Sequence, residues 1–304
     1  MLGEVFYWLF NMSIAAAVSG TVILLLRRIK QIPRRFIAAL WAIPFLRMWL
    51  PVGLGSRYSL MSLISRVTTK TVVVYEWYDG ASFTYSNFVM AANSYFPITY
   101  KVNLLEHIFS AASAIWIAIA AALWILLALL YNAATRELRS AKQLRDNLYL
   151  SDKITTPAVY GILRPKIILP DSYQNKDLTF VLLHETVHLR RRDNLWRLLA
   201  FLAAALHWFN PLAWVFLKYF LADLEFSCDE KVLRTCGAEH KKAYALSLVD
   251  CAENHSVLIS AFGGAKIRVR VENILSYRKL SLFSAVCFAM LMLAIAYVLL
   301  TNAV

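Results

Sequence analysis

The sequence predicts a mainly α-helical membrane protein, with four transmembrane helices and an α+β domain between the third and the fourth. Of its 304 residues, 60% are hydrophobic and the mean hydropathy is +0.54, which is rare in a soluble protein of this length. Four apolar stretches are long enough to cross the hydrocarbon core as helices. Basic residues gather beside these stretches, so the formal charge of +13 indicates cytoplasmic membrane flanks and no direct binding of nucleic acid.

Residues 1–54 predict a transmembrane hairpin. Its first helix is expected over 5–26 and is interpreted as a retained span, because no basic run precedes it and no small-residue cleavage site follows it. The basic turn 27–35 marks the cytoplasmic side. The second helix is expected over 36–54, where the costly charge of Arg47 predicts a polar partner or an interfacial position.

Residues 55–104 form a polar, aromatic-rich stretch that predicts an external loop. Within it, two strand-like segments flank Asp79-Gly80, a pattern typical of a β-hairpin over 72–85. Residues 105–131 predict the third transmembrane helix, and residues 280–304 predict the fourth, apolar over 280–300. Because every basic flank falls on the same side, we expect a multi-pass protein of the cell membrane with both termini outside.

Residues 132–279 alternate polar and apolar stretches, which indicates a folded cytoplasmic domain. The apolar run 195–220 is broken by Asn210-Pro211 into halves too short to span, so a kinked pair or an inserted hairpin is expected. The other expected elements are strands at 147–150, 158–160 and 166–169, a helix starting at Asn175 or Asp177, a helix over 221–234 capped by Gly237, and a helix over 239–254.

The strongest chemical signal is His184-Glu185-Thr186-Val187-His188. Two histidines four residues apart share one face of a helix, so both imidazoles can reach a single metal ion. The intervening Glu185 can hold and deprotonate a water. This is the HExxH arrangement of zinc peptidases, although the pattern also occurs by chance.

A zinc site of this kind needs a third protein ligand. Glu225 and Asp229 are four apart on the next predicted helix, so Glu225 can ligate the metal and Asp229 can orient a ligating histidine. The competing interpretation is a solvated acidic face that also includes Glu230. Other candidate ligands are His207, in an apolar run, and His240 and His255, beside polar stretches. The chain has four cysteines without CxxC spacing, which argues against a cysteine zinc site: Cys228, Cys236, Cys251 and Cys287. The three within 132–279 are expected to be reduced thiols.

Several motifs together resemble the BlaR/MecR type of integral-membrane zinc metallopeptidase, the antirepressors of inducible β-lactam resistance. They occur in the family's order over roughly half of the chain, a far more specific match than HExxH alone. The matching stretches are 156–161, 164–170, 184–188, 207–212 and 225–230, with a similar basic stretch over 266–278.

The resemblance implies a zincin-like (gluzincin) domain held among four transmembrane helices of a bacterial membrane. It implies that Zn2+ is bound by His184, His188 and Glu225, with Glu185 as the catalytic base. A signal sensed outside would then activate a protease that cleaves itself and promotes cleavage of a cytoplasmic winged-helix repressor. A homodimer is one candidate oligomeric state.

One departure from the family concerns the sensor. The chain stops at Val304 and contains no penicillin-binding domain after the last span, so we expect no sensing of β-lactam by acylation of this chain alone. The input would come through 55–104, a partner protein or the membrane.

Two other functions remain open at this point. One is a quality-control or processing protease of the HtpX or Ste24 kind, which also uses HExxH and a distant glutamate. The other is a non-catalytic signalling scaffold with a structural metal. For the favoured hydrolysis, sequence assigns no oxyanion donor, with Tyr244 and His240 as guesses, and Gly263-Gly264 is a candidate point of self-cleavage.

Overall fold

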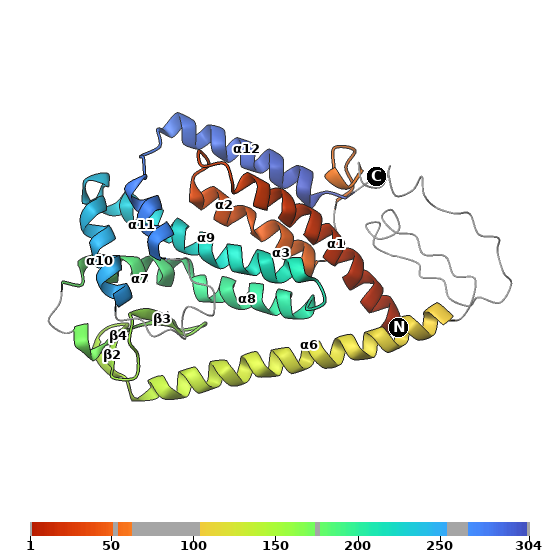
Figure 1. The fold of residues 1–304 in the computed structure, drawn as a ribbon, viewed down its shortest axis with the longest axis horizontal. Helices are drawn as coiled ribbons and strands as arrows, with labels where there is room; N and C mark the ends of the chain where they lie inside the picture. The colour runs from red at the N-terminus through yellow and green to blue at the C-terminus, as the bar shows by residue number, and fades with distance from the viewer. Residues whose placement is uncertain (1, 51–53, 63–103, 174–176, 254–266, 303–304) are drawn as a thin grey trace.

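The computed structural model describes residues 2–50, 54–62, 104–173, 177–253 and 267–302. Within these ranges, three helices are long and apolar enough to cross a membrane: α1 (Leu2–Leu26), α6 (Leu104–Glu137) and α12 (Leu282–Leu300). Figure 1 shows α6 along one side of the molecule, α12 along the opposite side, and both chain ends at the end away from the sheet. The described part is therefore mostly helical, as the sequence predicts for a membrane protein.

The second predicted span differs from the expectation of one long helix. It consists of two short helices, α2 (Arg34–Leu40) and α3 (Ala42–Trp49), which meet at Trp41. Pro44 has no N–H to donate to the carbonyl of Leu40, one turn earlier, which accounts for the break at this point.

Arg47 is buried in α3 with polar partners at the end of α12. Its guanidinium donates to the carbonyl oxygens of Leu299 (2.5 Å) and Thr301 (2.6 Å) and to Oδ1 of Asn302 (3.1 Å). The expectation of a polar partner for this charge is confirmed. The same bonds fasten the end of α12 to α3.

The apolar run 195–220 forms a helical hairpin, as expected from its Asn-Pro break. Its helices are α8 (Asp193–Leu206) and α9 (Pro211–Cys236), and the Asn210 side chain accepts a hydrogen bond from the Leu212 amide at the start of α9. The tip is held among the span candidates, because Asn210 Nδ2 donates to Ser13 Oγ (2.7 Å) and Trp116 Nε1 donates to the Leu206 carbonyl (2.8 Å). The larger apolar core is formed by α1, α2, α3, α8, α9 and α12 (Figure 1).

A four-stranded sheet follows α6 in the order β1-β2-β4-β3. Strand β2 pairs parallel with β4, and the two outer pairs are antiparallel. The predicted strands are confirmed within a residue or so as β2 (Leu148–Ser151), β3 (Ala158–Tyr160) and β4 (Lys166–Pro170), but β1 (Lys142–Arg145) was interpreted only as a basic flank. Its four residues are all exposed, so no apolar alternation announces a strand.

The remaining helices surround a second, smaller core at the sheet end. They are α7 (Thr179–Arg191), α10 (Lys241–Glu253) and α11 (Ile267–Leu275), with short 3-10 turns at Leu138–Ser140, Asp171–Tyr173 and Ala238–His240. Apolar side chains of α7, α9, α10 and α11 fill this core, including Val187, Val232, Leu248 and Ile274. The predicted hairpin over 72–85, His255 and Gly263-Gly264 lie outside the described residues.

Candidate metal centre

Helix α7 places the two histidines of the HExxH motif side by side. Asp177 Oδ1 accepts a hydrogen bond from the Thr179 amide at the first turn of α7, close to the predicted start. His184 Nε2 and His188 Nε2 are 3.1 Å apart, and both imidazoles are buried. Glu185 lies between them on the same helix and is also buried, with 8% of its surface exposed.

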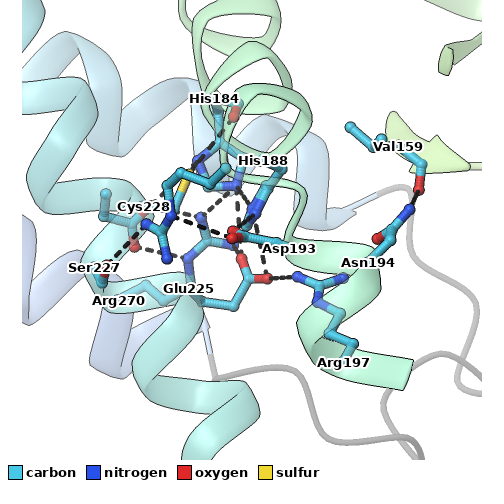
Figure 2. A network of polar contacts seen from close by, with 12 residues as sticks. Val159, His184, His188, Asp193, Asn194, Arg197, Glu225, Ser227, Cys228 and Arg270 are labelled. Carbon is cyan, nitrogen blue, oxygen red and sulfur yellow. Dashed lines mark hydrogen bonds and ion pairs between the residues drawn. The ribbon is translucent and has the colours of Figure 1, made fainter. Parts of the chain in front are cut away.

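Helix α9 brings Glu225 to the same two nitrogens. Its Oε2 is 3.5 Å from His184 Nε2, and its Oε1 is 3.6 Å from His188 Nε2. Figure 2 shows the Glu225 carboxylate turned toward both imidazoles from the opposite helix. The residues that the sequence groups as metal ligands thus converge.

The spacing of these atoms suits a tetrahedral ion. With ligand bonds of about 2.1 Å, as for zinc, the ligand atoms of a tetrahedron lie about 3.4 Å apart. The three observed separations, from 3.1 to 3.6 Å, scatter around this value. Two imidazoles and one carboxylate are also the donor types of many catalytic zinc sites, so the residues present fit such an ion.

The outer nitrogen of each histidine has a polar partner. His188 Nδ1 lies 2.6 Å from Oδ2 of Asp193, an aspartate at the start of α8 that was not among the residues predicted from the sequence. His184 Nδ1 lies 2.9 Å from the Tyr244 hydroxyl, which donates to Asp229 Oδ1 at 2.6 Å. Asp229 therefore supports His184 mainly through Tyr244, since its direct separation from Nδ1 is 3.5 Å. Both arrangements leave Nε2 available to a metal.

Two arginines flank the Glu225 carboxylate, and neither was singled out from the sequence. Arg197 Nη2 of α8 lies 2.5 Å from Oε1, and Arg270 Nη1 of α11 lies 3.4 Å from Oε2. Arg270 also binds Asp229 in a fork, with Nε to Oδ2 at 2.9 Å and Nη2 to Oδ1 at 2.7 Å. Both guanidinium groups are visible beside Glu225 in Figure 2.

Cys228 is a further donor that the missing CxxC spacing concealed. It follows Glu225 by one helical turn on α9, and its thiol groups with His184 and His188 closely enough to share a metal ion. Its Sγ lies 3.4 Å from His184 Nδ1. None of the four cysteines, all of which lie in the described ranges, forms a disulfide bond.

The charges of this cluster shift its titration. Burial lowers the pKa of His184, but Cys228 and Glu225 outweigh that effect and raise it to about 9. Burial also lowers the pKa of His188, but Glu225 and Cys228 outweigh that effect and raise it well above its ordinary value. Burial alone would raise the pKa of Glu225, whereas the adjacent imidazoles hold it well below the usual range.

The other described candidate ligands lie elsewhere. His207 is fully buried at the tip of the α8–α9 hairpin, where its Nε2 lies 3.0 Å from the Met48 carbonyl. His240 precedes α10 with half of its side chain exposed, and its ring packs near Phe180. Neither shares the cluster formed by α7 and α9.

A protein-family comparison agrees with the motifs. A family model described as BlaR1 peptidase M56 matches residues 7–274, a range that includes most of α1, the whole α8–α9 hairpin and every residue of the cluster described above.

Individual relatives match over shorter stretches. The regulatory protein BlaR1 of Bacillus licheniformis is 39% identical over 88 residues, which are 28% of this chain and 15% of that protein. The methicillin resistance mecR1 protein of Staphylococcus aureus is 26% identical over 106 residues, 34% of this chain and 18% of the relative. The regulatory protein BlaR1 of Staphylococcus aureus is 26% identical over 161 residues, 48% of this chain. The matches thus span between 15% and 28% of these relatives' own length.

Proposed function

This chain belongs to the BlaR1 peptidase M56 family, and from that premise we propose that it is a membrane-embedded, zinc-dependent endopeptidase of transmembrane signalling. The observation that carries the proposal is the approach of the Glu225 carboxylate to both Nε2 atoms of His184 and His188. Family membership favours this function over a protease of the HtpX or Ste24 kind.

The chemistry proposed is hydrolysis of a peptide bond. A zinc ion held by His184, His188 and Glu225 would polarise the scissile carbonyl and lower the pKa of a water toward neutrality. Glu185 takes a proton from the attacking water as its oxygen bonds to the carbonyl carbon. The same carboxyl then gives that proton to the amine nitrogen as the C–N bond breaks.

The surrounding residues hold the imidazoles for this task. Asp193 fixes the ring of His188, and Tyr244 with Asp229 fixes that of His184, so each Nε2 keeps its lone pair for the metal. We assign Asp229 to this orienting role. Buried partners of this kind restrict the rotation of both rings.

The proposed targets are the chain itself and a cytoplasmic winged-helix repressor. The proposed topology has four spans, the second of them formed by α2 and α3, with both termini outside and the metal centre cytoplasmic. The bundled basic residues of 27–35 support this orientation, because positive charge is retained on the cytoplasmic side. A homodimer is the assembly that we would test first.

The test uses the full chain purified in lipid nanodiscs with zinc. It is incubated alone, with a candidate repressor encoded by a neighbouring gene, and with a quenched fluorescent peptide library. We expect fragments or fluorescence that a chelator abolishes. Glu185→Gln should keep its zinc yet lose cleavage, because the amide cannot accept the water proton.

The matched control is Glu239→Gln, which changes a carboxylate with 73% of its side chain exposed and should leave cleavage intact. Full cleavage by the Glu185 variant would contradict the base role. Zinc binding without cleavage of any of the three substrates would favour a signalling scaffold with a structural metal.

A further inference from the structure

Arg270 contacts two proposed metal ligands, His184 and Glu225, and also Asp229, which orients His184. Its Nη2 lies 3.3 Å from His184 Nε2, its Nη1 lies 3.4 Å from Glu225 Oε2, and its fork binds Asp229. Only 13% of its side chain is exposed. Figure 2 shows its guanidinium group between the helix that carries Glu225 and the imidazole of His184.

Arg270 has more N–H donors than its hydrogen bonds to Asp229 occupy. A guanidinium group has five N–H donors in a fixed fork, and the two bonds to Asp229 engage only one at Nε and one at Nη2. The remaining donors lie on the side of His184 Nε2 and Glu225. Arg270 therefore offers fixed positive charge to whatever binds there.

The distances place that charge where hydrolysis creates a negative one. An ion bonded at about 2 Å to His184 Nε2 and Glu225 lies within a few ångström of both Nη atoms of Arg270. The carbonyl oxygen of a peptide bound beside those ligands would be within hydrogen-bonding reach of the guanidinium. In a buried site, such a preorganised donor stabilises developing charge far better than it would in water.

The other candidate donors are less suitable. The Tyr244 hydroxyl is already engaged between His184 Nδ1 and Asp229, behind the imidazole. His240 is half exposed and outside the cluster. Arg197 lies at the other oxygen of Glu225, 2.5 Å away, with 35% of its side chain exposed.

We propose that Arg270 is the oxyanion-stabilising residue of this site, an inference that rests on the proposed peptidase function. As the water oxygen bonds to the carbonyl carbon, the π electron pair of the C=O bond moves to the carbonyl oxygen, and Arg270 donates a hydrogen bond to it. The pair returns when the C–N bond breaks and the amine leaves with the proton from Glu185.

The test compares Arg270→Gln with Arg268→Gln, an exposed arginine two residues earlier on α11 that pairs with Glu272. Both variants are assayed as full chains in nanodiscs with the library peptide that the unaltered chain cleaves fastest. We expect Arg270→Gln to lower kcat by about 100-fold or more. The KM and the zinc content of Arg270→Gln should change little. Arg268→Gln should keep the kcat of the unaltered chain.

A second readout separates catalysis from a structural role. A phosphoryl dipeptide, which is a tetrahedral anion resembling the hydrolysis intermediate, should lose affinity for Arg270→Gln by about the same factor as kcat falls. A residue that only holds Asp229 would instead reduce zinc content and raise KM. Either that pattern or an unchanged kcat would overturn the inference.

Arg270→Lys serves if the glutamine variant does not fold. One ammonium group cannot bind Asp229 in a fork and also reach the peptide oxygen, so we expect kcat to fall by about tenfold with zinc retained. Full kcat in this variant would overturn the inference. Absence of hydrolysis by the unaltered chain would overturn the proposed function as well.

Discussion

In the candidate metal centre, each imidazole has a different acidic residue on the side of its Nδ1 atom. Asp193 bonds His188 directly, whereas Asp229 acts on His184 through the Tyr244 hydroxyl. Asp193 is itself paired with Arg191, 3.2 Å away, and is almost fully buried. Such outer partners orient the rings and raise the basicity of Nε2, so the centre extends well beyond the HExxH motif.

Zinc content separates the roles of Glu225 and Cys228, which lie one turn apart on α9. If Glu225 is the third ligand, Glu225→Gln will bind much less zinc, because an amide is a far poorer ligand than a carboxylate. Cys228→Ser will keep its zinc. The measurement is metal per chain after dialysis, and loss of zinc in the serine variant alone would assign the thiol as the ligand.

Zinc affinity should increase with pH. Although burial lowers the pKa of His184, Cys228 and Glu225 raise it to about 9, so below that pH a proton occupies the imidazole that we propose as a metal ligand. Each proton displaced makes the apparent Kd fall about tenfold per pH unit until the pKa is reached. Competition with a coloured chelator between about pH 6 and pH 9 measures this slope. An affinity independent of pH would contradict the raised pKa.

Spacing along the chain predicted part of this site. The sequence contains two pairs of candidate residues four positions apart, His184 with His188 and Glu225 with Asp229. The structure brings the two pairs together. Asp193 and Arg270 could not be found in this way. Asp193 follows the end of α7 at Arg192, whose left-handed backbone conformation reverses the direction of the chain. Arg270 lies in a basic stretch that resembles an ordinary membrane flank.

At the scale of elements, the basic turn after α1 is bound to helix α9 on both sides of Glu225. Arg27 Nε bonds both oxygens of Asp223 at 2.8 and 2.9 Å, and Trp41 Nε1 donates to the same carboxylate at 2.8 Å. The backbone amide of Arg35 donates a hydrogen bond to Glu230 Oε2 at 3.1 Å, and its Nε lies 3.5 Å from Oε1. These contacts fix α9 relative to the N-terminal hairpin.

Breaking the Arg27–Asp223 pair should destabilise the chain. Asp223 has no exposed side-chain surface, so Arg27→Met leaves a buried charge without its cation, a loss of about 3 kcal/mol. Arg28→Met, which changes an exposed neighbour, should have little effect. Thermal unfolding of both variants in nanodiscs measures the difference. Equal unfolding temperatures would show that the pair contributes little.

The elements that were predicted well are those with a local signal. Turn residues bound β3 and β4, Asn210-Pro211 marks the start of α9, and Gly237 ends it with a φ of 99°. Helix α11 was missed because only Ile274 among its nine residues is fully buried. The break between α2 and α3 was not predicted, because the apolar composition of 36–54 indicated one continuous span although Pro44 lies within it.

On the scale of the whole molecule, the sheet, α10 and α11 lie at one end and the two chain ends at the other (Figure 1). The three candidate spans run between these ends, and the α8–α9 hairpin packs among them. Only 17% of the most apolar part of 110–140 is buried inside the molecule, so as a membrane span it would expose most of its surface to lipid.

This arrangement predicts which exposed positions face outward. Cysteine introduced at Arg57, near the chain ends, should react with a membrane-impermeant maleimide on intact cells. Cysteine introduced at Arg139, after α6, should react only after lysis. The unaltered chain gives the background from its own thiols. Labelling of the Arg139 variant on intact cells would reverse the proposed orientation.

The attachment of α11 has a consequence for control of the reaction. Its C-terminal residue, Leu275, is separated from the first residue of α12, Leu282, by a short connection, whereas the histidines and Glu225 belong to α7 and α9. If α12 tilts in the membrane, we expect α11 to move with it, which would change the distance from Arg270 to a bound peptide while α7 and α9 keep the proposed zinc ligands. On the proposed function, we therefore expect a stimulus in the bilayer to change turnover without release of the metal.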